Sequence, residues 1–337
     1  MKVSTKKLAK KFFEISGFPA NSKIDKINEH YLIGDWDDLF SNIGRPNYKK
    51  VVVLEDVSAL TYWVNILGKS NVSFWHKENE FVDEVSKTGV KTYKDYNMIP
   101  KNIPQVGNPA FSIAEDIFLN MPSNQEVCMV MPAWVAVAPT WEAQSWGKKR
   151  QIKQHLETIG LKELFWIPNA TFEQVGADGK TSKAQVDSVL VVTEPGYTGD
   201  VTVTDLEDNS SYTVSRGGIY PRRFETLNFV DRFKQGNKLK WTAEQKTNFV
   251  ARKWTIGVNE QNPYAKAKGK NGPHLKGLSI FAPGDNIKKN TCYCEFNNEK
   301  DARTALAKLT SDDIANAYQL VTTKRTISSV VLRMLKI

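Results

Sequence analysis

Residues 51–75 read VVVLEDVSALTYWVNILGKSNVSFW and contain the pattern that decides the fold. Two short runs of β-branched and aromatic residues, 51–54 and 72–75, enclose a longer apolar segment, 58–67, which has the length of a helix. A buried strand, a helix and a second buried strand in succession make up the β-α-β unit of a parallel sheet. The segment therefore predicts an α/β fold.

The same alternation continues toward the C-terminus. Helices are expected at 80–85, 112–120 and 151–159, and strands at 90–93, 127–131, 163–167 and 186–192. Apolar strands between helices predict a Rossmann-like sheet covered on both faces, with ligands at the carboxyl ends of the strands. The sheet is expected to end at Glu194-Pro195-Gly196, and residues 201–205 and 212–214 are expected to form a short hairpin beyond it.

The charge is distributed unevenly along the 337 residues. Residues 1–200 contain 23 Lys and Arg against 24 Asp and Glu, whereas residues 201–337 contain 23 against 13. Length and this asymmetry predict two domains, residues 1–215 and a smaller basic α+β domain of residues 216–337. A basic domain after a neutral one is typical of a protein that docks on phosphates, so nucleic acid is the expected partner; a merely solvated basic surface is the alternative.

Other classes of protein fit the composition less well. The apolar runs are far shorter than the roughly 18 to 20 residues of a membrane span, and no apolar core follows the charged start of the chain, so a cytoplasmic protein is expected. An amphipathic helix is expected at residues 4–15. Three cysteines and four scattered histidines predict neither a disulfide framework nor a metal site.

Residues 106–111 read VGNPAF, in which the Asn-Pro pair alone is typical of a turn. The tetrapeptide Asn108-Pro109-Ala110-Phe111 resembles the catalytic N-P-P-[YF] motif of the amino-group (N6-adenine) DNA methyltransferases. In that family the Asn side chain and the next carbonyl accept hydrogen bonds from the adenine amino group, and the aromatic ring stacks on the flipped base. The resemblance assigns these catalytic roles to Asn108, Pro109 and Phe111, while Ala110 replaces the second proline.

The resemblance spans residues 45–337 in the order cofactor region, catalytic loop and recognition domain. Residues 103–106 resemble the strand before the motif, 127–132 the following strand and proline, and 298–309, 311–318 and 328–332 the closing segment of the recognition domain. The resemblance thus makes 1–215 a methyltransferase-like domain and 216–337 a DNA target-recognition domain. It implies S-adenosylmethionine as cofactor and transfer of its methyl group to N6 of a flipped adenine in duplex DNA.

The cofactor region departs from the family pattern. The family has a glycine-containing turn after the first strand, but residues 45–67 contain no glycine. The acids that remain as candidate cofactor ligands are Glu55, Asp56, Glu78 and Asp95; for Asp95 the alternative is a solvated loop acid. This departure leaves open a catalytically inactive DNA-binding relative, or an enzyme that transfers a different group.

The second domain supplies the expected DNA contacts. Its cations alternate with Tyr220, Phe224, Trp241 and Trp254, as in surfaces that neutralise phosphates and stack on bases. The DNA-binding candidates are Arg222, Arg223, Lys240, Lys266, Lys268, Lys270, Lys324 and Arg325, with Arg216, Lys234, Lys238, Arg252 and Lys253 in the same basic part. No nuclease motif is evident, so we expect a solitary modification protein of a phage or mobile element, related by analogy to restriction-modification systems.

Overall fold

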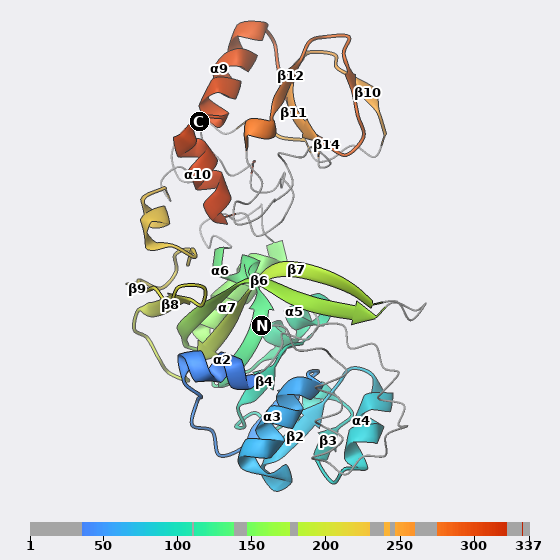
Figure 1. Ribbon diagram of the computed structural model, residues 1–337, viewed down its shortest axis with the longest axis vertical. Helices are drawn as coiled ribbons and strands as arrows, with labels where there is room; N and C mark the ends of the chain where they lie inside the picture. The colour runs from blue at the N-terminus through green and yellow to red at the C-terminus, as the bar shows by residue number, and fades with distance from the viewer. Residues whose placement is uncertain are drawn as a thin grey trace. The chain divides into compact units, whose positions relative to one another are not determined.

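The computed structural model describes residues 36–109, 111–137, 147–175, 181–229, 239–242, 247–259 and 275–321 and residue 332 (Figure 1). The helix expected at residues 4–15 lies outside them. The chain divides into two compact units. Unit 1 comprises residues 1–135 and 151–218, and unit 2 comprises residues 136–150 and 219–337.

Unit 1 is built on a nine-stranded sheet with the order β3-β2-β1-β4-β5-β7-β6-β8-β9. Its strands are β1 (Val51–Leu54), β2 (Val72–Trp75), β3 (Lys91–Tyr93), β4 (Gln105–Gly107), β5 (Val127–Pro132), β6 (Leu161–Val175), β7 (Thr181–Thr193), β8 (Val201–Asp205) and β9 (Ser211–Val214). Strands β1 to β5 are parallel, and the order reverses between β1 and β4, which makes that point the topological switch of a Rossmann-like sheet. The predicted α/β fold class is confirmed.

Helices follow most of the parallel strands. Those that follow are α3 (Val57–Leu67), α4 (Asn79–Ser86), α5 (Phe111–Asn120) and α6 (Trp134–Val137), while α2 (Trp36–Ile43) precedes β1 and α7 (Gly147–Thr158) precedes β6. Short 3-10 turns are η2 (Lys69–Asn71) and η3 (Tyr96–Met98). Helices α3 and α4 pack on β1, β2 and β3. Because β1 and most of α3 are completely buried, this pair forms the centre of the apolar core of unit 1.

The predicted end of the sheet at Glu194-Pro195-Gly196 is wrong. Strand β8 pairs with β6 in parallel and β9 with β8 in antiparallel, so the expected hairpin extends the same sheet. Strands β6 and β7 also run much further than expected, as a long antiparallel hairpin. Its register shifts between Ile167 and Ala170, around Pro168, because a proline within a sheet is accommodated at an irregularity of this kind.

Unit 2 is a smaller α+β structure. Strand β11 (Trp254–Asn259) lies between the antiparallel strands β12 (Ser279–Phe281) and β14 (Thr291–Phe296), and β10 (Phe249–Val250) pairs with β13 (Asn286–Ile287). Helix α9 (Glu299–Leu309) packs on the three-stranded sheet, and α10 (Asp312–Val321) contacts the 3-10 turns η4 (Phe224–Phe229) and η5 (Leu275–Gly277). Cys292 and Cys294 lie on β14 and are buried, and neither forms a disulfide within the described residues.

No helix within the described ranges is both long and apolar enough to cross a bilayer.

Candidate active site at the carboxyl edge of the sheet

The register of the parallel strands brings the predicted site residues to one edge of the sheet. Leu54 of β1 pairs with Trp75 of β2 and with Gly107 of β4. The residues that follow these strands, Glu55 and Asn108, therefore leave neighbouring strands at the same carboxyl edge. This is the edge at which open α/β sheets bind ligands, and the two residues flank the switch point.

Asn108 is held close to β1 by the glycine that precedes it. Gly107 has a φ of +135°, and a Cβ atom built on it would lie only 2.5 Å from the carbonyl oxygen of Leu54. Glycine is thus required for β4 to approach β1 this closely. Asn108 itself is 2% exposed and Pro109 is buried, so the first half of the tetrapeptide is packed into the structure. Phe111 begins α5.

The turn after β1 keeps a left-handed backbone although it has no glycine. Glu55 has a φ of +57°, a conformation that is uncommon for residues with a side chain. Its Oε1 atom accepts a hydrogen bond of 3.0 Å from the backbone N–H of Lys77, just beyond β2. Strained residues of this kind cluster at ligand sites, so Glu55 remains a good candidate for contact with a ligand.

Asp56 is already engaged within the protein. It is the N-cap of α3, where Oδ1 accepts hydrogen bonds from the Ala59 N–H at 3.0 Å and the Ser58 hydroxyl at 2.5 Å. The Trp36 indole N–H donates to Oδ2 at 3.1 Å. Burial raises the pKa of Asp56, while these hydrogen bonds oppose the rise. The carboxyl group therefore fills the amino end of α3, where anionic ligand groups bind in many α/β proteins.

The two other acidic candidates are exposed on the same edge. Glu78 follows β2 and precedes α4, but its side chain makes no capping hydrogen bond to that helix. Asp95 follows β3 and caps η3, where Oδ1 accepts a hydrogen bond of 2.9 Å from the Asn97 N–H. Both carboxylates are accessible to a ligand that lies along the edge.

The contrast between two helix-capping acids gives a stability prediction. We expect Asp56→Ala to lower the free energy of unfolding by about 2 to 3 kcal/mol, because it removes a buried cap and the acceptor for the Trp36 indole. Glu78→Ala, at an exposed cap position without such a bond, should change it by less than about 0.5 kcal/mol. Urea denaturation of both variants measures the difference. Equal effects would contradict the structural role of Asp56.

The predicted DNA-binding residues are only partly described. Arg222 and Arg223 are half-buried beside η4, and Lys240 is exposed. Lys266, Lys268, Lys270, Lys324 and Arg325 lie outside the described residues. Among the interleaved aromatic residues, Tyr220 and Trp241 are buried at 0% and 4% exposure, whereas Phe224 is 56% exposed. Phe224 is therefore the exposed one of these three aromatic residues.

Arg216 has a structural environment within unit 1. Its guanidinium group donates hydrogen bonds to the backbone carbonyls of Glu157, Leu161 and Gly199, at 2.6, 3.1 and 3.3 Å. It also lies over the ring of Tyr197, 5.5 Å from the centroid. These contacts tie the end of β9 to α7 and the start of β6.

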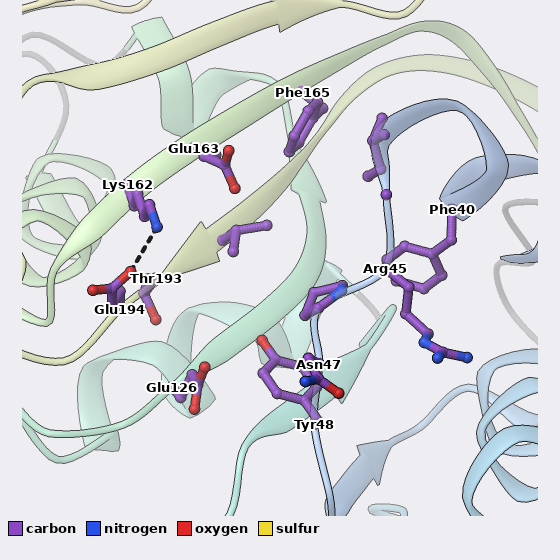
Figure 2. A pocket seen from close by; sticks show the side chains of 14 residues that line it. Phe40, Arg45, Asn47, Tyr48, Glu126, Lys162, Glu163, Phe165, Thr193 and Glu194 are labelled. Atoms are coloured by element: carbon purple, nitrogen blue, oxygen red, sulfur yellow. Dashed lines mark hydrogen bonds and ion pairs between the residues drawn. The ribbon is translucent and has the colours of Figure 1, made fainter.

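A cavity of about 450 Å³ lies at the opposite edge of the sheet (Figure 2). Tyr48 precedes β1, Glu126 precedes β5 and Glu163 stands near the start of β6, so these residues mark the amino edge. Sequence reasoning did not find this cavity, because its walls come from four segments that are far apart in the chain. No cluster of histidine, cysteine and acidic residues suited to a metal ion occurs in the part of the chain that the structure describes.

No protein-family model matches the chain, and no curated protein matches it. Similar solved structures include a candidate RNA methyltransferase from Pyrococcus horikoshii, at 16% identity and a TM-score of 0.35, which covers 56% of this chain and 100% of that one. A dimethyladenosine transferase from Plasmodium falciparum matches at 11% identity and a TM-score of 0.31, over 47% of this chain and 60% of that one. A nuclease-deletion mutant of the Type ISP restriction-modification enzyme LlaGI, in complex with a DNA substrate mimic, matches at 10% identity and a TM-score of 0.31, over 74% of this chain and 34% of that one. TM-scores this low do not identify a fold by themselves, so the Rossmann-like fold of unit 1 is identified from its own strand order.

Proposed function

We propose that this chain is an S-adenosylmethionine-dependent methyltransferase that modifies N6 of a flipped adenine in duplex DNA. The observation that carries the proposal is the position of Asn108 and Pro109 directly after β4, beside the switch point and next to Glu55. A resemblance in sequence and a ligand-binding position in the fold thus coincide at the same residues.

Asn108 and Pro109 would recognise the reacting amino group. An adenine amino group has two N–H donors, and the Asn108 amide oxygen and the Pro109 carbonyl oxygen are two acceptors on consecutive residues. Hydrogen bonds to both would orient the nitrogen and stabilise the positive charge that develops on it during transfer. The amino nitrogen would gain the methyl group as the bond from that group to the cofactor sulfur breaks, and would then lose a proton to solvent.

The carboxyl edge suits part of the cofactor. S-adenosylmethionine would supply a methyl group on a positively charged sulfur, and its amino and ribose hydroxyl groups are hydrogen-bond donors. Glu55, Glu78 and Asp95 offer carboxylate acceptors along this edge. Of these, Glu55 lies nearest to Asn108 in the register of the sheet, so we assign it to the amino group of the cofactor.

A second candidate function is DNA binding without catalysis. Asp56 supports it, because its carboxylate occupies the amino end of α3 and would repel the carboxylate of the cofactor there. In this alternative Asn108 and Pro109 still bind the adenine, but the site for the methyl donor S-adenosylmethionine has been lost.

In either case, unit 2 would supply the cations that bind the phosphates. Arg222, Arg223 and Lys240 are the described members of this set, and Lys266, Lys268, Lys270, Lys324 and Arg325 complete it. Phosphate contacts fix the position of a protein on a duplex, and their loss weakens binding to all sequences alike.

Calorimetric titration with S-adenosylmethionine, followed by transfer of a labelled methyl group, separates the two functions. Cofactor binding together with labelling of unmodified duplex DNA supports the enzyme. Salt-dependent binding of DNA without cofactor binding rejects the enzyme and supports the second candidate. Labelling of RNA of the same sequence in place of DNA would reject duplex DNA as substrate. If the protein bound neither S-adenosylmethionine nor DNA nor RNA, both functions would be rejected.

A further inference from the structure

The cavity at the amino edge of the sheet has the size of a small-molecule site. Its volume of about 450 Å³ falls within the range of about 300 to 1,000 Å³ that is typical of such sites. Polar side chains make up more than half of its lining, among them Tyr48 and three glutamates. The apolar part includes Phe40 of α2, Phe165 of β6 and Val192 of β7. This edge lies opposite the one that carries Asn108.

Tyr48 presents a buried polar atom to this cavity. Its side chain is 8% exposed, and its hydroxyl has no hydrogen-bond partner among the described residues. The ring packs against Trp63, with centroids 5.7 Å apart, and Figure 2 shows the hydroxyl on the side of the ring that faces Glu126. A buried hydroxyl without a partner is costly, so a ligand that bonds to it would be favoured.

Two carboxylates accompany this hydroxyl. Glu126 and Glu163 line the cavity and are half-buried, and both interact electrostatically with the Tyr48 hydroxyl. Burial raises the pKa of Glu126, and the negative charge of the nearby Glu194 raises it further. This is the direction expected for a carboxylate without a compensating cation.

The cations at the cavity have other partners. Lys162 forms an ion pair with Glu194, with 2.6 Å between Nζ and Oε2. Arg45 hydrogen-bonds to the Tyr62 side chain, and Figure 2 shows its guanidinium group directed away from Glu126. Lys162 also interacts electrostatically with Glu163, whereas the groups that shift the pKa of Glu126 include no cation.

We propose that this cavity is a second ligand site, for a primary amine with an apolar or aromatic body. An ammonium group has three donors and no acceptor, which matches the Glu126 carboxylate and the Tyr48 hydroxyl oxygen, which face each other in Figure 2. Phe40 and Phe165 provide the surface on which the body of the ligand packs. This site is independent of the methyl-transfer proposal, because no residue is shared between the two edges.

A series of three probes with one apolar body tests the ligand class. Phenethylamine, phenethyl alcohol and phenylacetate carry a positive, a neutral and a negative group on the same phenyl-bearing chain. We expect the amine to bind about tenfold more tightly than the alcohol, and the acid not to bind, in calorimetric titrations of the full chain. Equal binding of amine and alcohol, or no binding of the amine, would overturn the proposal.

Variants then locate the site. The variant Glu126→Gln should weaken phenethylamine binding by about tenfold, and Tyr48→Phe by a smaller factor, with binding of the alcohol little changed. Glu80→Gln, which changes an exposed carboxylate on α4, is the matched control and should bind as the unaltered chain does. Circular dichroism checks the fold of each variant. Unchanged amine binding in a folded Glu126→Gln variant would exclude this cavity as the site.

Discussion

Asn108→Ala should reduce methyl transfer to adenine by at least about 100-fold, the size of effect seen when one preorganised hydrogen-bond group is removed from an active site. The Asn108 amide oxygen is one of two acceptors proposed for the amino group, and alanine leaves only the Pro109 carbonyl. Single-turnover transfer of a labelled methyl group to duplex DNA measures the rate. The affinity for DNA should change by less than about threefold, because phosphate contacts dominate affinity.

Asn120→Ala is the matched control for this experiment. Asn120 ends α5, is exposed, and donates a hydrogen bond of 2.8 Å to the Asp116 carbonyl, away from the carboxyl edge of the sheet. It should leave the transfer rate unchanged. Full activity in a folded Asn108→Ala protein would remove Asn108 from the proposed site, whereas parallel loss of activity and of DNA binding would assign it to DNA docking.

The parallel part of the fold could be predicted from the sequence because its central strands are buried on both faces. The run Val51–Leu54 at β1 is apolar throughout and the run Val72–Trp75 at β2 is apolar except for Ser73, and the structure buries every one of these residues. A continuous apolar run between helices has few interpretations, so the strands are found within a residue or two of their bounds.

The long β6–β7 hairpin escaped prediction for the opposite reason. Pro168 and Asn169 follow the apolar run of β6 and are typical of the end of a strand, yet the strand continues past a shift in register. The place of β8 in the sheet cannot be predicted from a linear pattern, because its pairing with β6 joins residues about 40 apart and leaves no local signal.

The same distinction applies to the site. The row of Glu55, Glu78, Asp95 and Asn108 follows from strand order, since each residue comes directly or shortly after a parallel strand. The use of Asp56 as a cap depends on Trp36 and Ser58, and a contact with Trp36 across 20 residues is invisible in a linear pattern. The turn after β1 has no glycine, and its sequence does not indicate that Glu55 adopts the left-handed conformation that a glycine would usually take.

Gly107→Ala should lower the free energy of unfolding by about 3 kcal/mol or more, since it combines an unfavourable backbone conformation with a steric clash. The new Cβ atom would lie 2.5 Å from the Leu54 carbonyl oxygen and 3.2 Å from the Leu54 nitrogen, both of them backbone atoms in the centre of the sheet. Neither atom can move without disturbing the pairing of β1 with β4. Chemical denaturation followed by circular dichroism measures the loss.

The variant Gly89→Ala separates the effect of the backbone conformation from that of the steric clash. Gly89 also has a positive φ, of +83°, but a Cβ atom built there has no neighbour within 4 Å, so only the backbone strain remains. This variant should lose about 1 kcal/mol. Equal losses in the two variants would mean that β4 shifts away from β1 at little cost. A larger loss at Gly107 would instead establish that the strand carrying Asn108 is fixed against β1 by a glycine, which is what a preorganised amino-group site at the switch point requires.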